Sequence, residues 1–276
     1  MEDFNLYKDI KERTDGEIYI GVVGPVRCGK STFIKRFMDL MVIPAITDTH
    51  KRDRANDELP QSSAGKTIMT TEPKFIPKEA AVINLDDETP VKVRLIDCVG
   101  YMTKGAVGHI EEDKERMVKT PWFDYEIPFT QAASIGTKKV ICDHSTIGMV
   151  ITADGSFGEF SREDYLEAED TTITELLSLG KPFVVLLNSS KPYSEQCKAY
   201  AKEISDKYGV TVLPVNCSQL KEEDIKNILE KCLLEFPITR LNFFIPKWVE
   251  ILPNDHWLKA EIISCIKEKI KVLRRM

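Results

Sequence analysis

Apolar and polar positions alternate along the chain in blocks of the length that strands and helices need. An apolar, β-branched run at residues 18–23 predicts a buried strand, and residues 30–41 continue at helical spacing. Further strands are predicted at 147–152, 182–187 and 210–215, and helices at 162–179, 194–208 and 221–235. Strands that alternate with helices of this length predict an α/β fold whose mostly parallel sheet is covered by helices on both faces.

Two residues fix the expected ends of the helix at 162–179. Ser161 is a plausible N-cap, and Gly180 stands where the helix should stop. The pattern therefore predicts both ends of this helix as well as its existence.

Three stretches before residue 138 lack the regular alternation. Residues 44–72 are polar and interrupted by proline and glycine, which predicts a long irregular loop, and such loops often have a function or are mobile. Residues 74–85 and 91–96 predict a strand pair joined by a turn at 86–89. Residues 101–137 contain scattered glycine, proline and aromatic residues, which predicts an elaborate loop with some helix.

The pattern changes again near the C-terminal end. Residues 243–249 are aromatic and read as extended, and a final helix is predicted from residue 255 or 256 to 275. We therefore expect one domain at 1–236, with an N-terminal arm at 1–17. The remainder, 237–276, is expected to be a linker and the truncated start of a middle domain.

Composition narrows the class of protein. The chain has 276 residues, is 42% hydrophobic and 30% charged, and has a net charge of −6, which disfavours nucleic acid as a partner. Its seven cysteines form no C-x-x-C pair, which indicates free thiols in a reducing compartment. The sequence shows no signal peptide and no apolar run of about 18 residues. We expect a cytoplasmic protein whose membrane contact, if any, is peripheral.

The first strand leads into a phosphate-binding motif. Residues 24–31 match G-x-x-x-x-G-K-[ST], between a predicted strand and a predicted helix. Gly24 and Gly29 let the backbone curl, so that its N–H groups and the helix N-terminus face a phosphate. Lys30 would reach the β- and γ-phosphates and the Ser31 hydroxyl would ligate Mg²⁺. The predicted nucleotide-binding residues are Gly24, Pro25, Val26, Arg27, Cys28, Gly29, Lys30, Ser31, Thr32 and Gly100. The alternative is a chance match in a tight strand-helix turn.

Two later segments carry groups that complete such a site. Asp97 and Gly100 form a D-x-x-G motif after a predicted strand, where the carboxylate can hold Mg²⁺ and the glycine N–H can meet a γ-phosphate. The alternative is an aspartate that ends a strand at a turn. In the loop before the strand pair, a threonine can close over Mg²⁺ and the γ-phosphate. Thr70 or Thr71 is favoured over Thr67, against the alternative of a solvated turn. The predicted catalytic residues are Lys30, Thr70, Thr71 and Asp97, and the predicted metal ligands are Ser31, Thr70 and Asp97.

Two departures from the sequence pattern of guanine-nucleotide-binding proteins narrow the prediction of which nucleotide binds and how fast it is hydrolysed. Guanine-specific proteins carry N-K-x-D after the strand at 182–187, but here residues 188–191 read N-S-S-K. Lys191 replaces the aspartate and offers no acceptor to guanine, so adenine is the better prediction. Tyr101 stands where several GTPases have a water-orienting glutamine, which predicts slow intrinsic turnover. A threonine or a neighbouring subunit would then orient the water.

The chain resembles a known family, the stage IV sporulation A proteins, which are spore coat morphogenetic ATPases of endospore-forming bacteria. The resemblance rests on the segments Asp15–Arg27, Gly29–Phe37, Thr67–Phe75, Asp97–Tyr101 and Asp143–Gly148. It implies a P-loop NTPase of the translation-factor-related (TRAFAC) GTPase type that lost guanine specificity and hydrolyses ATP with Mg²⁺. It also implies that Lys30 is the P-loop lysine, that Asp97 lies on the Mg²⁺ side, and that Thr70 or Thr71 is the sensor.

The resemblance further implies partners and a location. Hydrolysis would drive self-association into a polymer, the basement layer of the spore coat. A small amphipathic membrane-binding peptide and other coat proteins would dock, mainly through a C-terminal region that this chain lacks. The protein would lie in the mother-cell cytoplasm, on the outer forespore membrane. Two alternatives stay open: a GTPase switch with a degenerate base pocket, and a nucleotide-binding scaffold without turnover.

Overall fold

The computed structural model describes residues 11, 14–60, 73–84, 90–106, 110–111, 114–238 and 243–272. It divides the chain into two units, Met1–Leu233 and Leu234–Met276. The predicted boundary between residues 236 and 237 lies a few residues after this division. The first unit contains the sheet and the phosphate-binding motif, and the second contains two helices.

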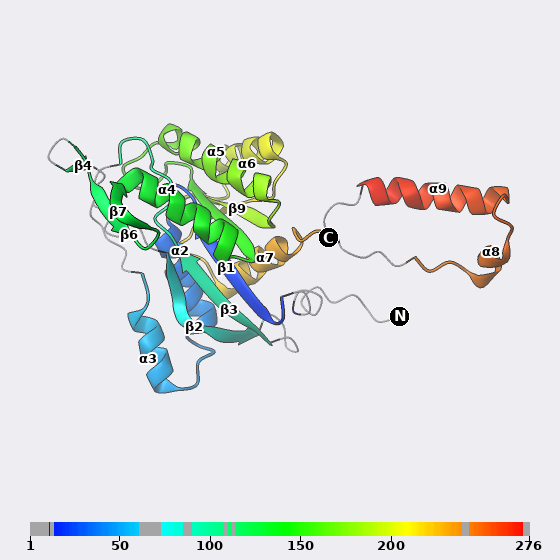
Figure 1. Cartoon of the computed structure of the whole chain (residues 1–276), viewed down its shortest axis with the longest axis horizontal. Coiled ribbons are helices and arrows are strands. Elements are labelled where there is room, and N and C mark those ends of the chain that lie inside the picture. Colours follow the sequence, from blue (N-terminus) through cyan, green and yellow to red (C-terminus); the bar gives the residue numbers. More distant parts are fainter. Residues whose placement is uncertain are drawn as a thin grey trace. The chain divides into compact units, whose positions relative to one another are not determined.

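A six-stranded sheet in the order β10-β9-β8-β1-β3-β2 forms the first unit (Figure 1). Its strands are β1 (Glu17–Val23), β2 (Lys74–Asn84), β3 (Pro90–Asp97), β8 (Ile147–Ala153), β9 (Phe183–Asn188) and β10 (Val212–Val215). All neighbours are parallel except β2, which pairs antiparallel with β3 at the edge. The prediction of a mostly parallel sheet is therefore confirmed.

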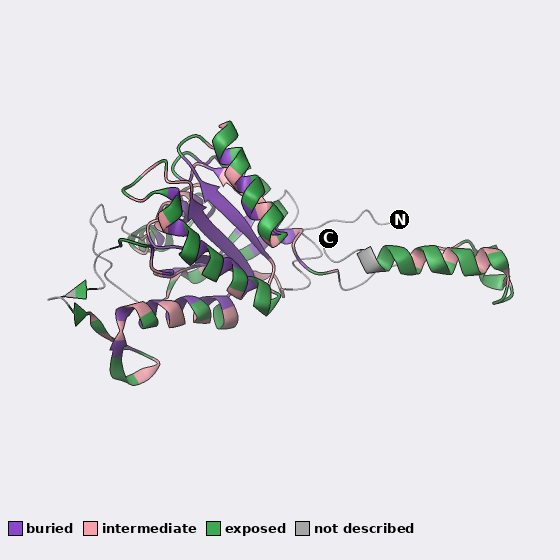
Figure 2. Ribbon diagram, turned by 90° about the horizontal axis from the view of Figure 1, so that it is seen from above, coloured by how far each residue is buried: buried purple, intermediate pink, exposed green. Residues whose placement is uncertain are grey.

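Helices cover both faces of this sheet (Figure 1). One face carries α4 (Phe129–Lys139), α5 (Arg162–Leu179) and α6 (Glu195–Tyr208), and the other carries α2 (Lys30–Phe37) and α7 (Glu222–Leu233). Both α2 and α4 continue into short π-helical segments, Met38–Val42 and Val140–His144. Because both faces are covered, every residue of β8 and β9 is buried, as Figure 2 shows for the middle of the sheet.

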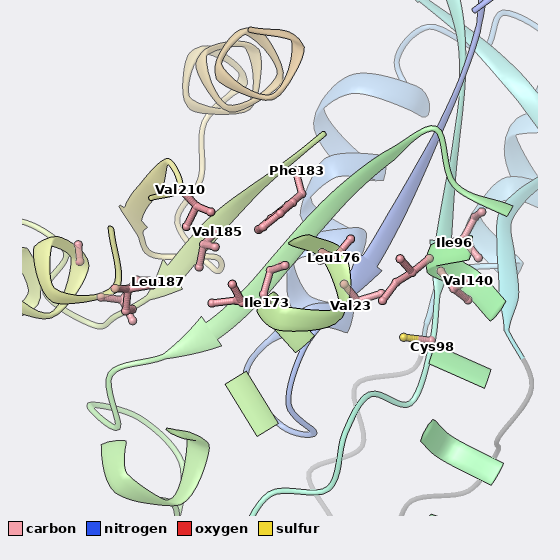
Figure 3. Close-up of a cluster of buried hydrophobic side chains, with 14 of the residues drawn as sticks. Val23, Ile96, Cys98, Val140, Ile173, Leu176, Phe183, Val185, Leu187 and Val210 are labelled. Carbon is pink, nitrogen blue, oxygen red and sulfur yellow. The ribbon is translucent and has the colours of Figure 1, made fainter. Parts of the chain in front are cut away.

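A cluster of buried hydrophobic side chains fills the space between the sheet and α5 and α6 (Figure 3). Val23 of β1, Val150 of β8 and Val185 of β9 meet Ile173 and Leu176 of α5 there. This packing fixes α5 across the middle strands. The carboxyl ends of those strands carry the site described below.

Helix α5 is held in place by its two capped ends and by a buried ion pair. Ser161 and Asp164 form a capping box at the N-terminus, and Gly180 ends the helix with φ 63°, so both predicted ends are confirmed. The Arg162 guanidinium donates to both carboxylate oxygens of Glu169, at 2.6 and 2.8 Å. Glu169 also accepts from the Thr152 hydroxyl of β8 at 2.6 Å, and Arg162 donates to the Ala153 carbonyl at 3.2 Å. The pair therefore ties α5 to the end of β8.

Two of the predictions for irregular segments are wrong in part. The stretch predicted as an irregular loop contains α3 (Thr49–Asp57), which Asp48 caps by accepting from the Lys51 N–H at 3.1 Å. Ala55 is the buried residue of α3, so the sequence shows no apolar period there. Within its described residues, the stretch predicted as a loop with some helix contains the start of α4, as predicted. It also contains the strands β4 (Ile110–Glu111), β5 (Lys114–Glu115), β6 (Met117–Thr120) and β7 (Phe123–Pro128). These strands are short and largely exposed, so apolar alternation did not reveal them.

The second unit contains α8 (Lys247–Ile251) and α9 (Trp257–Val272). The prediction of an extended segment at 243–249 is wrong for its last residues, because Pro246 starts a helix with its fixed φ of −57°. The final predicted helix corresponds to α9. None of the helices in the described ranges is long and apolar enough to cross a membrane.

Candidate functional site

The phosphate-binding motif forms the turn between β1 and α2, at the carboxyl end of the sheet. Gly24 has φ 137° and Gly29 has φ 106°, in a region that side chains disfavour. A Cβ on Gly24 would lie 2.1 Å from the Ile151 carbonyl oxygen, and one on Gly29 would lie 2.3 Å from the Asn188 amide nitrogen. The curl of the loop therefore favours glycine at both positions. At Gly24 the β8 backbone also leaves no room for a side chain, and at Gly29 the Asn188 side chain occupies that space.

The Lys30 ammonium lies inside this loop. Its Nζ donates to the carbonyl oxygens of Gly24 at 3.2 Å and Pro25 at 2.5 Å, and the residue is only 6% exposed. Lys30 opens α2, so its charge lies at a helix N-terminus, where anions are favoured. Ser31 and Thr32 follow in the same turn and are partly exposed. The predicted phosphate-binding residues from Gly24 to Thr32 thus lie in the loop and the first turn of α2, around the Lys30 ammonium.

The Asn188 side chain holds the phosphate loop by a hydrogen bond, a role that the sequence did not predict. Its Nδ2 donates to the Cys28 carbonyl at 2.9 Å, and its Oδ1 accepts from the Cys217 N–H at 3.0 Å. The Cys28 thiol donates to the Ile151 carbonyl at 2.8 Å and is fully buried, so it packs against β8. The signal was available, because Asn188 ends β9 at the edge where β1 also ends.

Asp97 and Gly100 reach the same place from β3. The register pairs Val22 with Asp97, so the D-x-x-G segment leaves the sheet beside the phosphate loop. Gly100 has φ 91°, and a Cβ on it would lie 2.0 Å from the Gly24 carbonyl oxygen and 2.6 Å from the Lys30 Nζ. The two predicted segments therefore meet backbone to backbone next to the ammonium group.

The Asp97 carboxylate fits a magnesium site. Its Oδ1 is buried and makes no hydrogen bond within the described part of the chain. Burial raises the pKa of Asp97 to about 6, and the nearby positive charges of Lys30 and Lys74 oppose that shift. The described residues contain no cluster of three His, Cys, Asp or Glu side chains that would form an all-protein cage. Ser31, Asp97 and nucleotide phosphates would be the partners of Mg²⁺, which binds in this way in many phosphate sites.

The raised pKa of Asp97 makes stability depend on pH in the metal-free protein. Between about pH 4 and pH 6 the folded state binds the Asp97 proton and the unfolded chain releases it, so the free energy of unfolding falls as pH rises. We expect Asp97→Asn to be more stable than the wild type at pH 7 by about 2–3 kcal/mol, and equally stable below about pH 4. Urea unfolding from pH 4 to pH 8 without metal or nucleotide measures this. A difference that stays constant with pH would contradict it.

The remaining predicted positions divide into three cases. Thr67, Thr70 and Thr71 lie outside the described residues. The Tyr101 hydroxyl donates to the Glu175 carboxylate of α5, so its ring does not play the part of a water-orienting side chain. Lys191 is exposed and its N–H donates to the Ser189 hydroxyl at 3.0 Å, in the loop that follows Asn188.

Comparison with known proteins agrees with this geometry. The family model described as the ATPase domain of stage IV sporulation protein A matches residues 1–237, and the model of its middle domain matches residues 238–276. The chain is 49% identical over its full length to stage IV sporulation protein A of Bacillus subtilis (strain 168). It is 51% identical over 266 residues to that of Clostridioides difficile (strain 630). These matches cover 56% and 54% of the two relatives, so the chain spans about half of their length.

Solved structures resemble the chain more distantly. One is a mutation variant of SsGBP, with a TM-score of 0.44 and 14% identity, covering 81% of this chain and 57% of that one. Another is the apo form of translation elongation factor SelB from Methanococcus maripaludis, with a TM-score of 0.42 and 11% identity. That match covers 79% of this chain and 33% of the SelB chain.

Proposed function

The chain belongs to the stage IV sporulation protein A family, and from this premise we propose that it binds ATP with Mg²⁺ and hydrolyses the γ-phosphate. The family's ATPase domain, which spans most of the chain, supports a nucleotide hydrolase. One observation carries the finer proposal: Lys30, Gly100 and Asp97 come from two different strand ends and meet at one phosphate loop. A structural turn needs neither the buried ammonium nor the unpartnered carboxylate oxygen.

The reaction would be an in-line attack of water on the γ-phosphoryl group, which breaks its bond to the β-phosphate oxygen and releases ADP and inorganic phosphate. Such a transfer needs little covalent chemistry from the protein, and depends on positioning and on neutralising negative charge. The Lys30 ammonium would supply positive charge, while the N–H groups of the loop and of Gly100 would orient the phosphate oxygens. Mg²⁺, when bound, would neutralise charge on the β- and γ-phosphates. Asp97 and Ser31 would hold it.

The base is proposed to be adenine. Lys191 takes the position of the carboxylate that guanine needs, and its ammonium only donates hydrogen bonds. Asn188, the last residue of β9, bonds to the phosphate loop three positions before Lys191, so the support of that loop does not depend on the base. A GTPase switch with a degenerate base pocket is the second candidate.

A phosphate-release assay separates these candidates. We expect kcat/KM for ATP to exceed that for GTP by tenfold or more, about 1.4 kcal/mol. Single-turnover release with an excess of protein tests hydrolysis itself. A preference for GTP would favour the switch, and nucleotide binding without release would favour a scaffold without turnover.

Assembly and location are proposed from family membership. We infer that hydrolysis drives self-association into a spore coat layer in the mother cell, at the forespore membrane. An amphipathic peptide and coat proteins are the proposed partners, mainly through the part of the relatives that this chain does not match. Sedimentation of the full-length protein with ATP, ADP or a non-hydrolysable analogue tests the first step. Polymer is expected with ATP only, and equal pelleting in all three samples would contradict it.

A further inference from the structure

Tyr101 joins the D-x-x-G segment to the phosphate loop through its backbone. Its carbonyl oxygen accepts from the Val26 N–H at 2.9 Å, and Tyr101 forms an isolated parallel bridge with Pro25. Thr103, two residues later, donates its hydroxyl to the Val26 carbonyl at 3.0 Å. Gly100, which comes directly before Tyr101, is thereby held against Gly24 and Lys30.

The side chain of Tyr101 extends the connection to α5. Tyr101 is 8% exposed, and its hydroxyl donates to the carboxylate of Glu175, a half-buried residue of α5. Burial, and then the hydrogen bond to Glu175, raise the pKa of Tyr101, so the phenol remains a donor at physiological pH. A hydrogen bond to a carboxylate is stronger than one between neutral groups. Tyr101 is therefore fixed on both sides.

Three more contacts join α5 to the phosphate loop, to the segment after Gly100 and to the end of β8. The Tyr165 hydroxyl donates to the Arg27 carbonyl at 3.3 Å. The Lys104 N–H donates to the Asp164 carbonyl at 3.3 Å. Arg162 holds the end of β8 through the Ala153 carbonyl. One helix thus contacts the phosphate loop and the segment after Gly100.

We propose that Tyr101 is a positioning residue whose hydrogen bond to Glu175 sets Gly100 against the phosphate loop, where it would meet the γ-phosphate. This inference rests on the proposed ATP hydrolysis. Tyr101 stands where several GTPases have a water-orienting glutamine. In this proposal Tyr101 affects turnover through the position of Gly100 and does not contact the attacking water. Because Gly100 would touch only the third phosphate, the tether should matter for ATP and not for ADP.

The test compares Tyr101→Phe with a matched control. Tyr208→Phe removes the same kind of bond to the same helix, since the Tyr208 hydroxyl donates to Asp170 at 2.5 Å, away from the phosphate loop. We expect Tyr101→Phe to lower kcat for ATP by about tenfold or more, because a small misplacement around the reacting group is costly. We expect its affinity for ADP to stay within about twofold of the wild type, and Tyr208→Phe to hydrolyse ATP normally.

Two Glu175 variants make the outcome decisive. Glu175→Gln keeps an acceptor oxygen and should retain turnover within about threefold. Glu175→Leu removes the same bond while leaving Tyr101 in place, and should lower kcat for ATP to the same extent as Tyr101→Phe. If Tyr101→Phe fails to fold, Glu175→Leu tests the tether alone. Normal turnover in Tyr101→Phe or Glu175→Leu, or an equal loss of ADP affinity, would overturn the proposal. A wild type that releases no phosphate from ATP would instead defeat the proposed function.

Discussion

Lys30→Ala is expected to reduce ATP turnover by about 10²–10³-fold or more, the size seen when a preorganised charge-stabilising group is removed. The Lys30 Nζ lies within the loop, bonded to the Gly24 and Pro25 carbonyls, and beside Gly100. ATP affinity should fall as well, because the ammonium would contact phosphates in the ground state.

A control on the same helix separates chemistry from folding. Lys35 lies on the exposed side of α2, and Lys35→Ala should keep normal turnover. Phosphate release, ATP binding and thermal midpoint would be measured for both variants. Unchanged turnover in a folded Lys30→Ala protein would remove this loop from the proposed reaction.

Glu169→Ala is expected to lower the free energy of unfolding by about 3–5 kcal/mol, because it leaves the buried Arg162 charge without its partner. Arg162 and Glu169 are 8% and 2% exposed, and two hydrogen bonds join them. The Thr152 hydroxyl of β8 would also lose its acceptor. Since the pair fixes the start of α5, part of the cost should appear as a loosened attachment to the end of β8.

A surface ion pair provides the comparison. Lys198 and Glu195 are 2.9 Å apart on α6, with side chains 54% and 91% exposed. Lys198→Ala should change the free energy of unfolding by no more than about 1 kcal/mol. Urea unfolding at pH 7 measures both variants. Equal effects of the two substitutions would show that burial does not govern the Arg162–Glu169 pair.

The phosphate loop could be predicted from the sequence because its signals are local. A β-branched run, two glycines at fixed spacing and a helical period follow one another within residues 18–41. Asp97 and Gly100 were also found by motif, since D-x-x-G follows a strand that the pattern revealed. Register then explains why they meet the loop: β3 is the parallel neighbour of β1.

The contacts that hold the loop could not be predicted in the same way. The bonds from Asn188 to Cys28 and from Tyr101 to Glu175 join residues 160 and 74 positions apart. Such pairings depend on strand order and on the placement of α5, which no local spacing specifies. Helix α3 was missed for a different reason, because its polar sequence shows no apolar face.

The hydrogen bonds of the Asn188 side chain separate binding of the phosphates from the choice between adenine and guanine. The Asn188 amide group donates to the Cys28 carbonyl and accepts from the Cys217 N–H, so both hydrogen bonds are made within the protein. Lys191, three positions later, is exposed and contributes no side-chain bond to that framework among the described contacts. In the proposed function, Asn188 holds the phosphate loop and Lys191 faces the base. An exchange at residue 191 is then expected to change the preference between adenine and guanine and to leave phosphate binding intact.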